Sequence, residues 1–203
     1  MTSALAPEKS CTIDDIYSLP DGKRAELIDS QIYYMAPPSR KHQDITGELF
    51  GIIREYIKLK NGSCRPYVSP FAVFLNEDDK NYVEPDISVI CDHNKLTDKG
   101  CSGAPDWIIE IVLPGSRRMD YFTKLFKYRT AGVREYWIVA PDKKRITVYD
   151  FEYEDTRDYT FSSSLSYSSA SSYSRIRFLK FDNSVRKAFL MFVASIFFCG
   201  VVP

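Results

Sequence analysis

The sequence predicts an α/β (α+β) domain in which a mixed β-sheet is flanked by helices. The first observation is an amphipathic segment at 39–60, whose apolar residues recur at helical spacing. The second is a pair of largely apolar segments, 82–90 and 106–112, with Asp86 inside the first and Glu110 inside the second. The third is the order of elements, because a helix, short strands, a turn and further strands are typical of a sheet with an early helix packed on one face.

The length of the chain is that of one domain, and its basic and acidic side chains are balanced. The chain has 203 residues, with 27 basic and 27 acidic side chains. Its length is enough for a real core, and its zero net charge does not indicate binding of nucleic acid by bulk charge, although it leaves room for a local basic patch. Five scattered cysteines without a C-x-x-C pair argue against a disulfide framework or a zinc knuckle and fit a reducing compartment. The N-terminus has no signal-peptide pattern, so we expect a cytoplasmic protein.

The first elements are short. Residues 12–20 are expected to form a helix, with a threonine as N-cap and a proline at the stop. Residues 25–35 predict a hairpin that turns at 29–30. Glu26 lies at the beginning of its first strand.

The clearest helix follows at 39–60 and ends at an Asn-Gly pair. His42 lies near its N-terminus. Strands are then expected at about 64–68 and 71–75, before a polar turn at 76–81.

Two acids mark the centre of the chain. Asp86 lies just inside the predicted strand 82–90, and Glu110 interrupts the predicted strand 106–112. A polar connection is expected between them at 91–105. A charge inside an apolar strand costs several kcal/mol unless it is paired or binds a metal, so two such acids predict a site.

A basic helix follows the second acid and is expected to run from about 116 to a C-cap glycine at 132. On it Asp120, Lys124 and Tyr128 recur at a spacing of four and share one face. Strands with large aromatic or alternating residues are expected after it, at 135–139 and 145–151.

The end of the chain differs from the rest. Residues 162–174 contain nine serines, and 188–202 are almost wholly apolar. Fifteen residues are short for a membrane span, which needs roughly 20. We therefore divide the chain into a folded domain at 12–161 and a tail at 162–203. We expect the apolar end to be a helix or strand that packs on the folded domain, or a non-native or truncated C-terminus. Either is favoured over a membrane anchor.

Two carboxylates at neighbouring strand ends can hold a hard divalent cation. Asp86 and Glu110 are the candidate ligands, and the backbone carbonyl of Ile111 is placed to be a third. Such a metal lowers the pKa of its bound water and shields charge on a phosphoryl oxygen.

The helix after Glu110 supplies the remaining candidates. Lys124 could orient or deprotonate the attacking water, or stabilise the phosphate in the transition state. Arg117 and Arg118, at the helix start, could pair with a polynucleotide phosphate.

Taken together, these motifs resemble the Uma-type endonucleases of the PD-(D/E)XK, restriction-endonuclease-like superfamily. The resemblance covers roughly residues 12–160 and includes Glu26 and His42. The motifs are Glu-Pro-Asp-Ile (84–87), Ala-Pro-Asp-Trp-Ile-Ile-Glu-Ile-Val (104–112), Asp120 with Lys124 and Tyr128, and Ala-Gly-Val-Arg-Glu-Tyr-Trp-Ile-Val (131–139). The resemblance implies a restriction-endonuclease-like mixed sheet flanked by helices, Mg²⁺ or Mn²⁺ at Asp86 and Glu110, and hydrolysis of phosphodiester bonds in DNA.

The sequence departs from the pattern of the family and its superfamily at four places. Val112 occupies the usual lysine position, and Lys124 is the residue that matches the family's lysine. The loop 113–116 is atypical and could alter the position of the helix, and Ala140 stands where an aspartate is common. The serine-rich tract also replaces the elements that usually close such domains.

Supporting roles are expected for Glu26 as a further acid near the metal, for His42 as a polar contact or ligand, and for Asp120 in orienting Lys124. The alternative structural interpretations are a turn cap for Asp86, a solvated ion pair for Lys124 and core packing for the aromatic residues.

Two other functions stay open. The chain could be a catalytically silent module of the same fold that binds DNA or a protein partner, or a membrane-tethered version could depend on residues 188–202. For the nuclease, DNA is the expected partner and a homodimer is plausible, because cutting both strands of a duplex needs two active centres.

Overall fold

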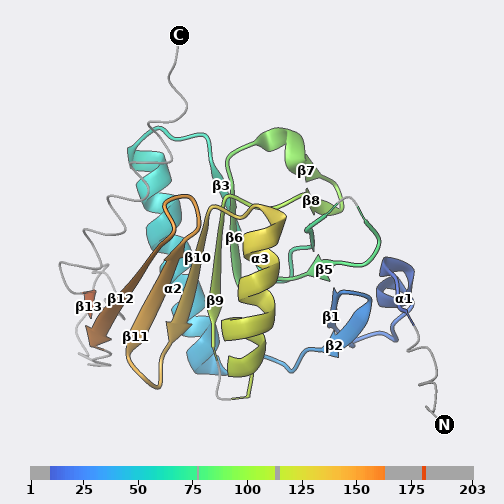
Figure 1. The fold of residues 1–203 in the computed structure, drawn as a ribbon. Coiled ribbons are helices and arrows are strands. Elements are labelled where there is room, and N and C mark those ends of the chain that lie inside the picture. Colours follow the sequence, from blue (N-terminus) through green and yellow to red (C-terminus); the bar gives the residue numbers. More distant parts are fainter. Residues whose placement is uncertain (1–9, 77, 113–114, 163–179, 182–203) are drawn as a thin grey trace, which may run out of the picture.

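The structure, a computed structural model, describes residues 10–76, 78–112, 115–162 and 180–181 of the chain (Figure 1). Its helical segments are α1 (Ile13–Tyr17), α2 (Arg40–Leu59), the 3₁₀ turn η1 (His93–Lys95), the π-helical η2 (Met119–Lys124) and α3 (Leu125–Ala131).

Two mixed sheets contain the strands. The large sheet has the order β13 (Lys180–Phe181), β12 (Asp155–Ser162), β11 (Arg145–Asp150), β10 (Glu135–Ala140), β9 (Trp107–Ile111), β6 (Ile87–Ile90) and β3 (Arg65–Val68). The small sheet has the order β2 (Gln31–Tyr34), β1 (Ala25–Ile28), β5 (Tyr82–Val83), β4 (Val73–Phe74), β8 (Gly100–Ser102) and β7 (Leu96–Thr97). The order of elements in the sequence predicted one sheet, whereas the structure has a second, smaller sheet.

The N-terminal elements confirm the local predictions. Thr12 precedes α1, and its backbone N–H donates to the Asp15 carboxylate at 2.8 Å, as in a capping box. The hairpin β1–β2 turns at Asp29 and Ser30, both with positive φ, as a two-residue type I′ turn requires. Helix α2 begins after Ser39, whose hydroxyl accepts the His42 N–H.

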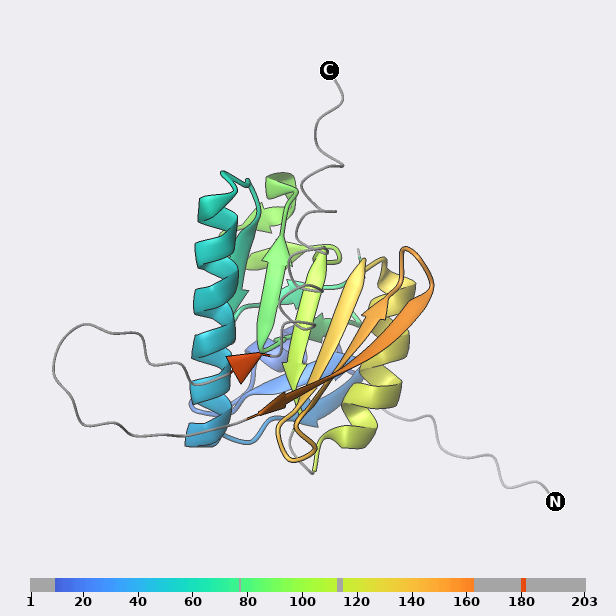
Figure 2. The same ribbon diagram turned by 90° about the vertical axis from the view of Figure 1, so that its left-hand side faces the viewer.

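The large sheet lies between α2 and α3, and Figure 2 shows one helix on each side of it. Alternation along β9 determines which helix each side chain meets. Ile109 and Ile111 pack with apolar residues of α2, whereas Ile108 packs with residues of η2 and α3. Successive side chains of a strand point to opposite faces, so Glu110 faces η2 and α3.

The segment 82–90 is not one strand. It divides at Pro85 into β5, which belongs to the small sheet, and β6, which belongs to the large sheet. Proline lacks the N–H that a continuous ladder needs. The predicted polar connection 91–105 is also wrong in part, because it contains η1, β7 and β8. Asp86 therefore lies at the junction of the two sheets, immediately before β6.

The predicted helix after the second acid is present but becomes a π-helix after its first two residues, Arg117 and Arg118. The segment η2 has the wider π turn, and α3 continues it to Gly132, which has the left-handed conformation expected of a C-cap. Residues 113–114 of the preceding loop lie outside the described residues.

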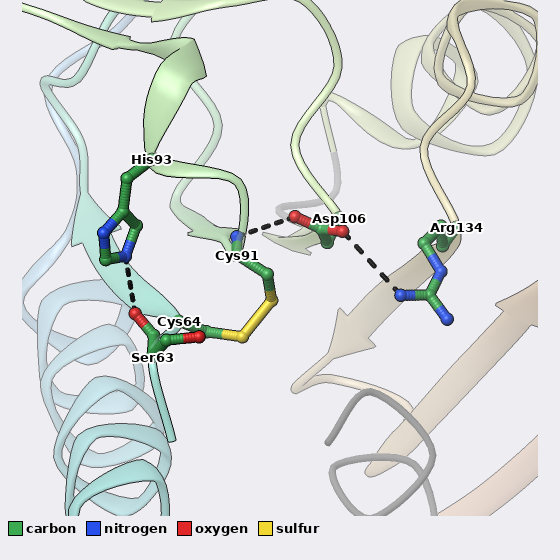
Figure 3. Close-up of a disulfide and its surroundings, with 6 residues drawn as sticks. All are labelled: Ser63, Cys64, Cys91, His93, Asp106 and Arg134. Carbon is green, nitrogen blue, oxygen red and sulfur yellow. Dashed lines mark hydrogen bonds and ion pairs between the residues drawn. A yellow bond between two sulfur atoms is a disulfide. The ribbon is translucent and has the colours of Figure 1, made fainter. Parts of the chain in front are cut away.

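Cys64 and Cys91 form a disulfide (Figure 3), so the expectation drawn from the scattered cysteines is wrong for this pair. The two cysteines lie one step beyond the antiparallel partners Arg65 and Ile90 of β3 and β6. Strand pairing thus brings together residues 27 positions apart. The backbone N–H of Cys91 also donates to the Asp106 carboxylate at 2.7 Å. The cysteines no longer support a reducing compartment.

Reduction of this disulfide is expected to lower the free energy of unfolding by about 3 kcal/mol, because closing a loop of this length restricts the unfolded chain. Urea unfolding with and without dithiothreitol measures the effect. The double variant Cys64→Ser/Cys91→Ser should show the lower stability in both conditions. A wild-type chain that is indifferent to the reductant would contradict the prediction.

Glu135, the first residue of β10, is a buried acid away from the predicted site. It is fully buried and accepts a hydrogen bond from the Trp137 indole. Burial raises the pKa of Glu135 to about 9, although the Trp137 bond opposes the rise. The carboxyl is therefore protonated in the folded chain at neutral pH.

Stability should consequently fall as the pH rises from the ordinary carboxyl pKa of about 4.5 to about 9, because the folded state binds a proton that the unfolded state has lost. Glu135→Gln cannot ionise, so we expect this variant to lose less stability between pH 5.5 and pH 8.5. Urea unfolding at both pH values tests this. Equal losses for the two proteins would refute the assignment.

The structure describes only part of the C-terminal segment about which the sequence made predictions. Strand β12 ends at Ser162, and Lys180–Phe181 pairs with its last two residues as β13. The expectations for the rest of 162–203 lie outside the described residues. None of the helices in the described ranges combines the length and apolar character needed to cross a membrane.

Candidate functional site

Lys124 is the centre of a buried polar cluster between the two sheets. Its ammonium lies 2.8 Å from a carboxylate oxygen of Glu26 and 2.9 Å from Oε1 of Glu110. Asp120, one turn earlier, lies 4.0 Å away. All four residues are at most 5% exposed. The structure therefore brings three acids, from β1, β9 and η2, around one lysine.

Glu110 is held through one of its two oxygens. Its Oε1 accepts hydrogen bonds from Lys124 and from the Tyr128 hydroxyl, at 2.9 and 2.8 Å. Its Oε2 accepts one long contact, 3.4 Å, from the Asp86 N–H. One oxygen is thus fixed, and the other lies beside the second predicted metal ligand.

Asp86 is oriented in a comparable way. Its Oδ2 accepts the Ile111 N–H at 2.7 Å and lies 3.0 Å from Nε2 of His42. Its Oδ1 makes no hydrogen bond with the described residues. The C=O of a strand residue points to the same side as its N–H, so the Ile111 carbonyl, the predicted third ligand, is expected on the side of Asp86.

Glu26 connects the small sheet to the lysine. The Glu26 carboxylate contacts Lys124 and also accepts a hydrogen bond from the backbone N–H of Glu84 at 3.0 Å. The Glu84 carboxylate is in turn bound by the Arg24 guanidinium and by the Tyr82 hydroxyl. This second layer of contacts fixes β1 against the Glu84–Asp86 junction.

The predicted spacing of Asp120, Lys124 and Tyr128 does bring them to one face, and all three are buried. Lys124 is the last residue of the π-helical η2, and π-helical turns are frequent at functional sites. The Tyr136 hydroxyl donates to the Asp120 backbone carbonyl at 3.2 Å and holds this turn on the sheet.

Crowding of acids changes the pKa values at the site. Burial raises the pKa of Glu110 to about 8; Lys124 opposes this rise, whereas Asp86, Asp120 and Glu26 add to it. Burial alone would lower the pKa of Lys124, but Glu110, Glu26 and Asp120 hold it well above its usual value. The lysine is therefore a stable ammonium, and the cluster has more acids than one lysine can neutralise.

The two predicted DNA-binding arginines lie outside this cluster. Arg118 is exposed, and Arg117 lies 3.8 Å from Asp142 in the β10–β11 turn. Neither contacts the acids around Lys124 within the described residues. They belong to the outer edge of the site.

The arrangement of oxygen atoms around Asp86 and Glu110 can be compared with what a divalent metal ion requires. In the described residues, no three or more aspartate, glutamate, histidine or cysteine side chains are arranged to hold a metal ion. The predicted set is smaller, two carboxylates and the Ile111 carbonyl, and Mg²⁺ commonly takes one or two carboxylates with water. Asp86 and Glu110 each keep one oxygen with few or no partners, so the donor set fits a hard divalent cation.

Two contributors were missed or undervalued by sequence reasoning. Tyr128 was interpreted as a core residue; it is fully buried, and its hydroxyl also binds Glu110. Its spacing of four from Lys124 was the available signal. Glu84 supports Glu26 through its backbone, and only its place in the Glu-Pro-Asp motif could have indicated this.

Residues 13–171, well over half of the chain, match the family model Uma2, described as "Putative restriction endonuclease". A solved structure is also similar to the chain: a putative nuclease belonging to DUF820 from Anabaena variabilis ATCC 29413. The two share 23% sequence identity with a TM-score of 0.61, over 76% of this chain and 87% of the other. No curated protein matches significantly. The fold is restriction-endonuclease-like, as the sequence predicted.

Proposed function

The chain belongs to the Uma2 family of putative restriction endonucleases, as the resemblance of its motifs indicated, and from this premise we propose that it hydrolyses phosphodiester bonds in DNA with a divalent metal ion. The observation that carries the proposal is the contact of one buried lysine with acids from two different sheets, beside a third acid at a neighbouring strand end. A core that served only folding would gain little from this arrangement, because desolvation of buried charges can exceed their attraction.

Asp86, Glu110 and the Ile111 carbonyl would hold the metal, Mg²⁺ or Mn²⁺. When bound, such an ion lowers the pKa of a water ligand and neutralises charge that develops on a phosphoryl oxygen. The chain prepares both carboxylates for this role by fixing one oxygen of each. His42 and the Ile111 N–H contact only Oδ2 of Asp86, and Tyr128 and Lys124 contact only Oε1 of Glu110.

Lys124 acts in this proposal as a donor. Because the neighbouring acids keep its pKa well above the usual value, it carries its proton at neutral pH. An ammonium can orient the attacking water or stabilise a phosphate oxygen, and it is a poor base. Of the three roles expected from the sequence, orientation of the water and stabilisation of the phosphate are favoured over deprotonation of the water.

Glu26 and Asp120 position this lysine. Glu26 is anchored by the Glu84 N–H and contacts Lys124 directly, whereas Asp120 lies further from the ammonium and on the same helix. We expect Glu26 to have the larger influence on the direction of the ammonium.

Cleavage of supercoiled plasmid and of single-stranded DNA, each with Mg²⁺, Mn²⁺ or EDTA, tests the proposal. Metal-dependent nicking that Asp86→Asn removes is the expected result. Direct conversion to linear plasmid would support action as a homodimer, since two centres are then needed. A folded chain that neither cleaves nor binds the metal would favour the alternative, a silent module that binds DNA or a protein partner.

A further inference from the structure

A set of exposed or partly exposed cations lies beside the strand ends that carry the site, and we call it the basic rim. It comes from three elements: the start of α2, the helical residues immediately before η2 and the turn between β10 and β11. Its members are Lys41, Arg117, Arg118, Lys143 and Lys144, with Asp142 as the one acid among them.

Ion pairs place these elements side by side. Lys41 lies 3.7 Å from Oδ1 of Asp142, and Arg117 lies 3.8 Å from Oδ2 of the same carboxylate. All three side chains are at least 40% exposed. Exposed pairs of this length contribute little to stability. The two ion pairs show that the cations lie next to Asp142, but they do not hold the cations tightly.

The rim lies at the same sheet edge as the acids. Strands β9 and β10 are parallel, with Ile111 opposite Val139, so both end at this edge, the lower one in Figure 1. The turn that carries Lys143 and Lys144 follows β10 directly. Lys41 precedes His42, which contacts Asp86.

The local charge contrasts with the balanced chain. The whole sequence has a formal net charge of zero, but the rim has five cations and one carboxylate, a formal charge of +4. Arg118, Lys143 and Lys144 are exposed, and none of them forms an ion pair with another described residue. A cationic edge beside an acidic centre attracts a polyanion and directs it toward that centre.

We propose that the basic rim binds the phosphodiester backbone of DNA and holds the strand across the Asp86–Glu110 edge. The proposal rests on the proposed nuclease function and extends it. The predicted contribution of Arg117 and Arg118 thereby becomes part of a surface in which Lys41 and the β10–β11 turn take part. Asp142 spaces two of the cations and partly neutralises them.

Binding can be measured apart from cleavage by fluorescence anisotropy in EDTA, with the Glu110→Gln chain and labelled duplex or single-stranded oligonucleotides. Lys143→Gln/Lys144→Gln should weaken binding about tenfold near 0.1 M salt and reduce the salt dependence by nearly two units, as expected when two phosphate contacts are lost. Asp142→Asn should tighten binding severalfold. Comparison of the two DNA forms shows which backbone the rim prefers.

Lys58→Gln/Lys60→Gln is the matched control, because it changes the net charge equally at the other end of α2. Equal weakening by the control pair, or unchanged binding by both rim variants, would overturn the rim proposal. Absence of DNA binding by the parent chain would overturn it as well. Should Lys143→Gln/Lys144→Gln fold poorly, Asp142→Asn alone decides.

The two proposals can fail separately. Wild-type cleavage with rim variants that bind like the parent would reject the rim and keep the nuclease. Rim-dependent binding by a chain that never cleaves DNA would reject the nuclease and keep the rim.

Discussion

Glu110→Gln should reduce metal-dependent cleavage of DNA at least about 100-fold, because loss of a metal ligand removes several kcal/mol of charge stabilisation and each 1.4 kcal/mol is about tenfold in rate. The amide keeps the size of the side chain and an oxygen for Lys124 and Tyr128. It removes the negative charge that the metal needs. Initial rates of plasmid nicking over a range of Mg²⁺ concentrations measure the loss.

The same substitution should leave stability unchanged or raise it. Burial and the neighbouring acids raise the pKa of Glu110 to about 8, so its ionised form is costly in the folded chain. Between the ordinary carboxyl pKa of about 4.5 and about 8, the folded state holds a proton that the unfolded state has lost, so stability falls as the pH rises through this range. Thermal melting at pH 6 and pH 8.5 should show a smaller fall for Glu110→Gln.

A matched control is available on the neighbouring strand. Glu135 is also a fully buried acid with a raised pKa, but it lies outside the site. Glu135→Gln is expected to preserve cleavage. Equal loss of activity in both variants would indicate a general effect of removing buried acids and would falsify the assignment of Glu110 as a ligand.

Lys124→Met should abolish cleavage and also destabilise the chain by about 3–5 kcal/mol, the usual cost of removing one partner of a buried ion pair. Glu26 and Glu110 would then face each other without a cation. Because protonation relieves this repulsion, the destabilisation should be larger at pH 8 than at pH 5.5. Urea unfolding at both pH values, with cleavage assays alongside, provides the measurement.

The double variant Lys124→Met/Glu26→Gln separates the two effects. Removal of one of the facing acids should restore part of the stability, whereas cleavage should stay absent because the ammonium is still missing. Recovery of both properties would show that Lys124 serves folding alone. Lys124→Arg keeps the positive charge but replaces the ammonium by a guanidinium, so it tests whether the site needs the smaller ammonium group.

Local sequence signals predicted most elements near the site. The apolar period placed the helix 39–60, and the Asp-Ser turn placed the hairpin 25–35. Asp86 and Glu110 do lie close together, and their role as metal ligands stays a prediction. The predictions of the helix and the hairpin succeeded because capping, periodicity and turn chemistry act over a few residues.

Predictions that needed distant contacts failed or were incomplete. Pro85 divides a segment that looked continuous, and the division assigns its halves to different sheets. The Cys64–Cys91 disulfide depends on the register of β3 and β6, which no spacing in the sequence reveals. The basic rim depends on three elements that meet only at the edge of the sheet.

By itself, the sequence predicted the long helices and most of the strands, singled out the two acids and the lysine as candidates, and indicated the family to which the chain belongs. Only the tertiary structure decided which oxygens are held, that Glu26 of the second sheet reaches Lys124, and that Tyr128 binds Glu110. The physical reason is the distance along the chain over which each interaction acts. Backbone preferences and side-chain periodicity are local properties, whereas hydrogen bonds and the pKa values of buried acids depend on neighbours that the chain brings together from 14 to 98 residues away.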